Sequence, residues 1–154
     1  METTEQHLFA EPEYHLVQAS MGKRFANYII DVLVFYAFMF MTGIVWGLVS
    51  PETTTILEEG GIVLNLIALL VYGLYMFVIE TLSGGKSLGK LITGTRAVNE
   101  DGTNVTTKAA LFRGLSRAVP FNAFSALGNP SYPWHDRWAN TYVIDERESN
   151  RPTV

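Results

Sequence analysis

The fold of this chain is decided by residues 22–49, which read GKRFANYIIDVLVFYAFMFMTGIVWGLV. No charged side chain occurs from Val32 to Val49. A helix of about 20 mainly apolar residues is long enough to cross the hydrocarbon core of a bilayer. The stretch therefore predicts a membrane span over residues 25–49.

Two charged residues lie on one face of this predicted span. Arg24 and Asp31 are seven positions apart, so at about 100° per residue their directions differ by only about 20°. A carboxylate inside a membrane helix is costly unless it faces protein, water or an opposite charge. We therefore expect Asp31 to face inward, and it is the first candidate functional residue.

A second apolar run, IVLNLIALLVYGLYMFVIE, predicts a second span over residues 62–80. Tyr75 lies at about the depth of Asp31, counted from the cytoplasmic end of each span at about 1.5 Å per residue. Its hydroxyl is a candidate partner for that carboxylate. The alternative is an aromatic side chain near the membrane interface.

The distribution of charge predicts the orientation of the chain. None of the eleven Lys and Arg residues lies between positions 25 and 85, and the loop between the spans carries three glutamates. By the positive-inside rule this loop lies outside and both termini are cytoplasmic. We interpret residues 1–20 as an acidic cytoplasmic tail, 21–146 as the membrane domain and 147–154 as a C-terminal tail.

Residues 108–119 predict an amphipathic third helix. Apolar side chains fall on one side, and Arg113 and Arg117 fall on the other at a spacing of four. Two arginines in the middle of the segment argue against a third full span. We expect an interfacial or re-entrant helix, with its arginines toward lipid phosphates or toward Asp31.

Two short strands are expected outside the membrane. Residues 91–98 have strand-like side chains before Asp101-Gly102, a hairpin turn signal. Residues 140–145, NTYVID, are the second candidate, and we expect 94–99 to pair with them. The expected fold class is mainly α, an integral membrane helical hairpin with a third amphipathic helix and a small cytoplasmic β-ribbon.

One glycine-rich motif invites a nucleotide-binding interpretation. Residues 84–90 fit GxxxxGK, but Leu91 stands where a phosphate-binding loop needs Ser or Thr, and the motif follows a span instead of a strand. A helix stop followed by lysines at the lipid surface explains the motif better. We expect no nucleotide cofactor.

The pair His135-Asp136 could belong to a metal site or a proton relay. A metal would need further ligands, and the other histidines lie in the N-terminal tail, so we expect no metal. Asp136 would then cap a short helix or pair with a base. The chain has no cysteine and no visible catalytic constellation, so we expect no enzyme activity. Its sparse basic residues also predict no nucleic-acid partner.

Several segments, taken in order, resemble one family. Arg24 and Asp31 are followed by GKSLGKLITGTRAVNEDG at 85–102, LFRGLSRAVP at 111–120 and HDRWANTYVI at 135–144. This pattern resembles the RDD family of bacterial multi-pass membrane proteins. The family's arginine and two aspartates correspond here to Arg24, Asp31 and Asp136. The resemblance implies a bacterial inner-membrane location and a role in the transport of unidentified ligands.

Two functions remain open at this point. In the first, a buried polar cluster carries an ion or small solute, and a homo-oligomer is required because two spans cannot enclose a path. In the second, the same charges hold together a structural or accessory membrane module that interacts with lipids or partner proteins. The Gly43 to Gly47 GxxxG motif offers a seam for self-association. The expected cluster consists of Arg24, Asp31, Tyr75, Arg113, Arg117, His135 and Asp136.

Overall fold

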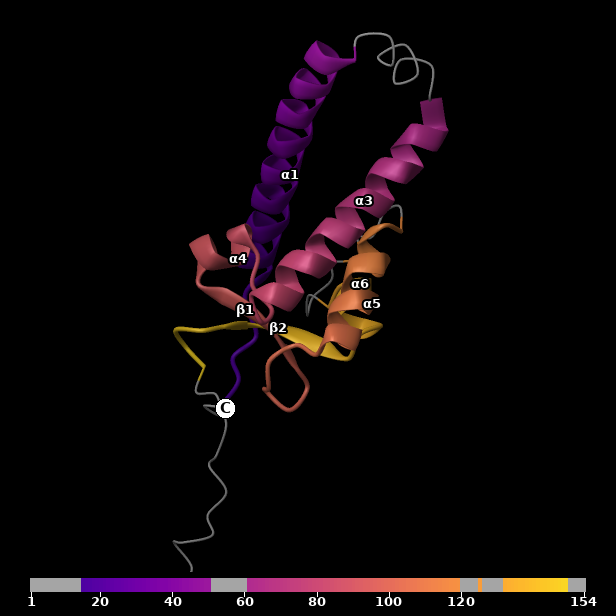
Figure 1. Cartoon of the computed structure of the whole chain (residues 1–154). Coiled ribbons are helices and arrows are strands. Elements are labelled where there is room, and N and C mark those ends of the chain that lie inside the picture. The colour runs from indigo at the N-terminus through magenta and orange to yellow at the C-terminus, as the bar shows by residue number, and fades with distance from the viewer. Residues whose placement is uncertain (1–14, 51–60, 120–124, 126–131, 150–154) are drawn as a thin grey trace, which may run out of the picture.

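Two long helices dominate the protein. The computed structural model describes residues 15–50, 61–119, 125 and 132–149. Helix α1 is Met21–Val49 and helix α3 is Gly61–Leu82. Both are long and apolar enough to cross a membrane. They rise from a small base and separate toward their far ends (Figure 1). The first 14 residues of the predicted tail, the loop at 51–60 and residues 150–154 lie outside the described residues.

Helix α1 begins four positions before the predicted span. Its N-cap is Ser20, whose side chain accepts a hydrogen bond from the Lys23 amide. Such a cap satisfies one of the free amides at a helix start. Lys23 and Arg24 therefore belong to the first turn of α1, and the arginine has a fixed direction relative to the rest of the helix.

The segment after α3 begins with a short helix where a strand was expected from residue 91. Helix α4 is Leu88–Thr93, with Ser87 as N-cap and Gly94 as C-cap in the left-handed conformation, at φ 69°. A serine cap before the segment and a glycine after it favour a short helix over an extended chain. The strand prediction for residues 91–93 is therefore wrong.

A two-stranded antiparallel sheet lies below the helices. Strand β1 is Thr95–Asn99 and β2 is Thr141–Asp145. Thr95 pairs with Asp145 and Asn99 with Thr141, which confirms the expected pairing of 94–99 with 140–145. The chain before α1 runs along β2, because the Ala19 amide donates to the Val143 carbonyl at 2.9 Å. The end of the predicted acidic tail therefore forms part of the folded base.

Helix α5, Thr107–Arg117, packs beside the lower part of α3 (Figure 1). The two backbones meet at a pair of glycines, since a Cβ added to Gly114 would lie 2.5 Å from the Gly73 carbonyl oxygen. The arginine face of α5 turns toward α3. The expectation that these arginines turn toward Asp31 is wrong, because both bind Glu80 at the end of α3. Their contact with lipid phosphates stays a prediction.

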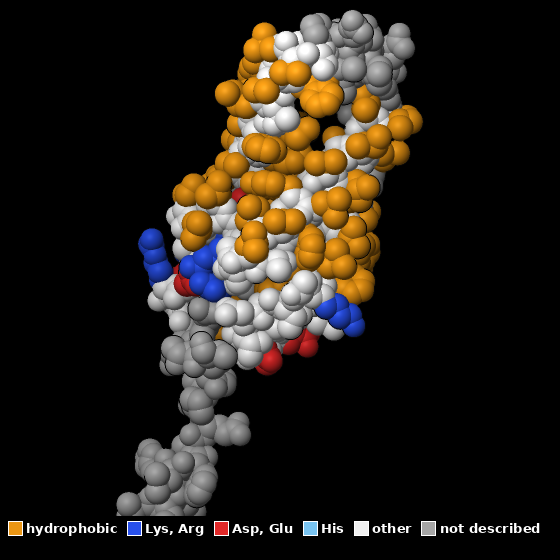
Figure 2. All heavy atoms as spheres, viewed as in Figure 1, with side chains coloured by type: hydrophobic (Ala, Val, Ile, Leu, Met, Phe, Trp, Pro, Cys, Tyr) orange, Lys and Arg blue, Asp and Glu red, His pale blue; other side chains and the backbone are white. Residues whose placement is uncertain are grey.

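The apolar face of α5 is on the outside. Leu111, Phe112 and Leu115 are 37%, 46% and 41% exposed. Hydrophobic side chains also cover most of the two long helices, while charged side chains gather at the lower end (Figure 2). An apolar exterior around a polar interior is the arrangement that a lipid environment favours.

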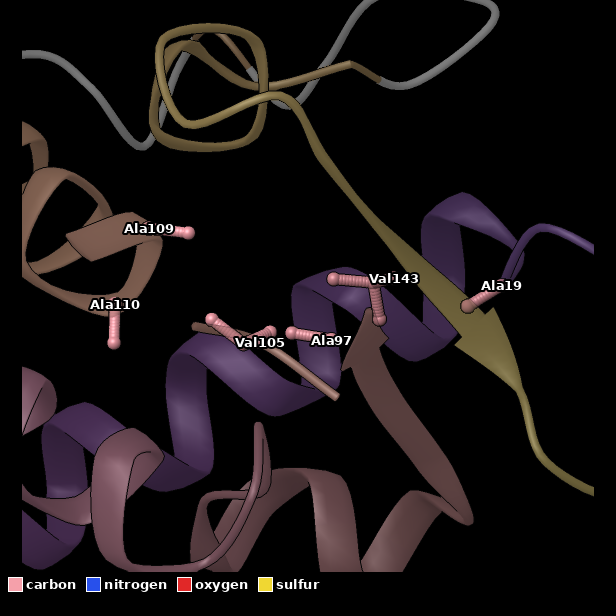
Figure 3. Packing of buried hydrophobic residues seen from close by; sticks show 6 residues of the cluster. All are labelled: Ala19, Ala97, Val105, Ala109, Ala110 and Val143. Carbon is pink, nitrogen blue, oxygen red and sulfur yellow. The ribbon is translucent and has the colours of Figure 1, made fainter. Parts of the chain in front are cut away.

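The hydrophobic core of the base is made of small side chains. Its buried members, drawn in Figure 3, are Ala19, Ala97, Val105, Ala109, Ala110 and Val143. Small side chains let the sheet, α5 and the start of α1 approach closely but bury little apolar area. Among the described residues, the two largest fully buried side chains are instead charged, Arg113 and Lys90. The interior of the base is therefore organised by charge.

Helices α1 and α3 touch through aromatic rings. The Phe35 ring lies 5.1 Å from that of Tyr72 and 5.5 Å from that of Tyr75, measured between centroids. Met76 completes this second small cluster. Above this contact the side chains of both helices are largely exposed, so the base and this aromatic contact set the angle between them.

The glycine contact between α3 and α5 leads to the first prediction. Gly114→Ala should lower the free energy of unfolding by about 1–3 kcal/mol, because the new methyl group would overlap the Gly73 carbonyl and Phe77. Gly43→Ala is the matched control, since nothing lies within 4 Å of its added Cβ. Thermal midpoints in detergent would measure both. An equal loss in the two variants would contradict a close contact at Gly114.

Candidate functional site

Arg24 connects the first turn of α1 to the sheet and to α6, which is the short helix Trp134–Arg137. Its Nη1 donates to Asp136 Oδ2 at 2.9 Å. Its Nε donates to the Ala19 carbonyl and its Nη2 to the Val143 carbonyl, each at 3.1 Å. The side chain is buried, and each of its three nitrogens has an acceptor. Arg24 therefore closes the junction between α1, α6 and β2.

Arg113 occupies the centre of the base. Its Nε donates to Glu80 Oε2 at 2.7 Å, and its Nη1 donates to the other oxygen of Asp136 and to the Thr141 hydroxyl. Its side chain is fully buried. Asp136 therefore bridges two arginines that lie far apart in the sequence. Charge-assisted hydrogen bonds of this kind are stronger than neutral ones and fix geometry.

Glu80 receives three cations at the end of α3. Lys90 Nζ and Arg117 Nη2 both donate to its Oε1, at 2.5 Å and 2.8 Å, while Arg113 binds Oε2. Glu80 and Lys90 are almost fully buried. We call the continuous set Arg24, Glu80, Lys90, Arg113, Arg117 and Asp136 the buried charge network.

The charges of this network shift the pKa of its members outside the long helices. Burial alone would raise the pKa of Asp136, but the positive charges of Arg113 and Arg24 outweigh burial and lower it. Burial lowers the pKa of Lys90 to about 8, because the attraction of Glu80 only partly offsets it and the two arginines of α5 add repulsion. Asp136 is therefore ionised at neutral pH, and Lys90 is mostly charged.

His135 lies beside the network but is uncharged at neutral pH. Its Nε2 is 3.5 Å from Asp136 Oδ1. Burial lowers the pKa of His135 well below its ordinary value, and the opposing attraction of Asp136 does not overcome burial together with Arg117 and Arg113. The imidazole is therefore neutral at pH 7.

Asp31 belongs to a separate polar group. Its Oδ2 accepts from the Ser87 hydroxyl at 2.6 Å and its Oδ1 from the Gly89 amide at 2.8 Å. Both donors stand at the start of α4, where helix amides are otherwise unpaired. Gly89 is required there, since a Cβ would lie 2.5 Å from the Asn27 carbonyl oxygen. The Asn27 amide also bonds the hydroxyls of Thr93 and Thr95.

The structure therefore brings together most, but not all, of the predicted residues. Arg24, Arg113, Arg117 and Asp136 lie in one network, with His135 beside it. The expectation that Asp31 meets Asp136 around an arginine is wrong, because neutral donors of α4 occupy both oxygens of Asp31.

The observed partners of Asp31 also differ from the predicted one, Tyr75. Tyr75 forms no hydrogen bond with Asp31 within the described part of the chain, and its ring packs on Phe35. Ser87 and Gly89 take its place. The reason is the angle between the long helices, which leaves α4 nearer to this face of α1 than α3 is.

Sequence reasoning missed Glu80 and Lys90. Glu80 is the only charged residue between positions 61 and 82, and the argument that singled out Asp31 applies equally to it. Lys90 was expected at the lipid surface, and this is wrong because its side chain is only 2% exposed. A basic residue at a helix end has no sequence signal that distinguishes a buried ion pair from a lipid contact.

Metal coordination finds no support in this arrangement. Among residues 15–50, 61–119, 125 and 132–149, no group of three or more His, Asp or Glu side chains is placed to hold a metal ion. The acidic side chains of the network are instead surrounded by Lys and Arg. What the site can do chemically is hold buried opposite charges together.

Two apolar helices and a charge network buried at their base define a small helical membrane protein. The sequence model of the RDD family matches residues 18–140, a range that contains Arg24, Asp31 and Asp136. The chain therefore belongs to the RDD family, which confirms the resemblance seen in its motifs. No curated protein and no solved structure matches the chain.

Removing the carboxylate of Asp136 tests the network. Asp136→Asn should lower the free energy of unfolding by about 3–5 kcal/mol, because it leaves the buried charge of Arg24 without a carboxylate and removes one of the two carboxylates of Arg113. Glu148→Gln removes the same charge at an exposed position and serves as the control. Denaturant or thermal unfolding in detergent measures both. A loss for Asp136→Asn no larger than for the control would contradict a central role for Asp136.

The neutral His135 predicts a pH dependence. Because its pKa is lowered in the folded protein, the unfolded chain binds the extra proton as pH falls below about 6.5. Stability should then fall between pH 6.5 and 5, with a slope of at most about 1.4 kcal/mol per pH unit. His135→Gln should flatten this slope. The carboxyl groups of Asp136 and Glu146 titrate lower, since their pKa values are also lowered. If His135→Gln kept the same dependence of stability on pH, that dependence would belong to another group.

Proposed function

We propose that this protein is a non-transporting structural or accessory membrane module. Its buried charge network fastens two membrane helices to a small cytoplasmic base, and its apolar exterior contacts lipids or partner proteins. One observation carries the proposal: all six carboxylate oxygens of Asp31, Glu80 and Asp136 accept hydrogen bonds from protein donors. Carboxylates held in this way fix packing, and a solute would have to displace a protein donor or share an oxygen with one.

The proposal includes a placement in the bacterial inner membrane. Helices α1 and α3 form a hairpin that crosses twice, with both termini cytoplasmic and the loop at 51–60 outside, as the absence of Lys and Arg from 25 to 85 supports. Helices α4 and α5 lie in the cytoplasmic leaflet. Their exposed apolar side chains support this depth: Leu88, Leu91, Ile92, Leu111, Phe112 and Leu115.

A second candidate function is transport of an ion or small solute by a homo-oligomer. The observation that favours it is the position of Asp31, which is buried inside an apolar helix with Tyr72 and Tyr75 within electrostatic range. An intramembrane carboxylate can couple a ligand to proton uptake. Two membrane helices enclose no path, so further copies would supply the other wall, and the open face at Gly43 is available for such contact.

Two substitutions at Asp31 distinguish these functions. In Asp31→Asn the amide oxygen can still accept from Gly89, and the amide nitrogen can donate to the Ser87 hydroxyl. Asp31→Ala instead leaves both donors without their acceptor. As a structural element, Asp31 should tolerate Asn and lose about 1–3 kcal/mol of stability with Ala. A proton-coupled transporter should stay folded as Asp31→Asn but lose flux, because an amide does not titrate.

The experiment combines unfolding in detergent with proton and cation uptake into proteoliposomes. We expect no uptake above that of protein-free vesicles for the natural sequence, and the stability order natural sequence, Asp31→Asn, Asp31→Ala. Uptake that Asp31→Asn abolishes would replace the structural proposal by transport. Equal stability of all three proteins without uptake would contradict both functions for Asp31.

A further inference from the structure

The buried charge network carries more positive than negative charge. Its cations are Arg24, Lys90, Arg113 and Arg117, and its anions are Glu80 and Asp136, which leaves an excess of two positive charges. Asp31 takes part in no ion pair with these cations among the described residues, because its oxygens bind the neutral donors of α4. Uncompensated charge away from water is strongly unfavourable. The network therefore favours a further anion.

Two donors mark where that anion would bind. Arg113 Nη2 and Arg117 Nη1 are buried and have no acceptor among the described residues. Three other nitrogens of these side chains already have acceptors. Nε and Nη1 of Arg113 and Nη2 of Arg117 bind Glu80 or Asp136. Buried donors are normally paired. A guanidinium group matches the oxygens of a phosphate particularly well, because its planar N–H groups fit two oxygens at once.

The surroundings indicate how the anion arrives. The Arg117 side chain is 10% exposed while that of Arg113 is fully buried, so the approach is from the C-terminal end of α5. His135 of α6 lies within electrostatic range of both arginines. Trp134 and Trp138 of α6 stack at 5.8 Å and are 38% and 53% exposed. Tryptophans at such positions are typical of the headgroup level of a membrane.

From these observations we propose that Arg113 and Arg117, beside His135 and the two tryptophans of α6, bind the phosphate group of an anionic membrane lipid. The acyl chains would lie against the exposed apolar face of α5. The same guanidinium groups could take free phosphate, but the exposed tryptophans of α6 favour a lipid. The proposal rests on the proposed placement of α5 in the cytoplasmic leaflet.

Delipidated full-length protein in a non-ionic detergent tests this site. Phosphatidylglycerol, diacylglycerol with the same acyl chains, and inorganic phosphate would be added separately, with the thermal midpoint and native mass spectrometry as readouts. We expect phosphatidylglycerol to bind and raise the midpoint, and the other two to have little effect. An equal rise with inorganic phosphate would overturn the lipid assignment in favour of a free anion. Equal binding of diacylglycerol would overturn the phosphate contact.

Variants locate the contact. Arg117→Lys keeps the positive charge near Glu80 but removes the second guanidinium nitrogen. It should weaken phosphatidylglycerol binding about tenfold, because one charge-assisted hydrogen bond to the phosphate is lost. Lys108→Gln changes an exposed base on the same helix and should bind as the natural sequence does. Equal affinity in these two variants would overturn the site.

Trp138→Ala provides a second arm that leaves the network intact, should Arg117→Lys fail to fold. It should weaken phosphatidylglycerol binding and leave any effect of inorganic phosphate unchanged. Binding unaffected by Trp138→Ala would overturn the placement beside α6. Solute flux does not enter these measurements, so their outcome and that of the uptake experiment are independent.

Discussion

The bridge that Asp136 forms between Arg24 and Arg113 is the interaction on which the rest of the base depends. Arg24 belongs to the first turn of α1, and Arg113 to the middle of α5. Asp136 itself stands on a four-residue helix that has no side-chain cap. Such a short helix has little stability of its own. Its position is therefore set by the two arginines, which draw the C-terminal part of the chain against the start of the first membrane helix.

Charge takes this role because the base buries little apolar surface. Alanine and valine fill its core, and lipid-facing side chains gain nothing from packing together when the solvent is itself apolar. A buried ion network adds less net stability than its number of contacts indicates, since each ion loses its hydration. Its value here is directional: the pairing of Glu80 and Asp136 with their cations fixes how α1, α3, α4, α5 and α6 lie against one another.

The sequence was informative wherever a single segment carried the signal. The two apolar runs predicted α1 and α3, and the β1 to β2 pairing followed from strand-like residues flanked by turn signals. Arg24 and Asp136 were identified by their place in a family pattern. The partners of Asp31 were not predictable, because interpreting residues 91–93 as strand concealed the start of α4, whose amide and hydroxyl bind the carboxylate. Lys90 was missed for a related reason, because its burial depends on how α4 and α5 pack. Glu80 was within reach of the argument used for Asp31, as the only charge in the second apolar run.

The separation of Arg24 and Asp136 along the chain has a consequence for biosynthesis. The two residues are 112 positions apart, and translation proceeds at about 5–20 residues per second. Helix α1 therefore leaves the ribosome on the order of ten seconds before the carboxylate that neutralises its arginine exists. During that interval Arg24 has no carboxylate of its own network to pair with, and a charged side chain of this kind stays at a water-facing surface of the membrane. The start of the first helix is thus anchored early, by a charge that the finished protein conceals.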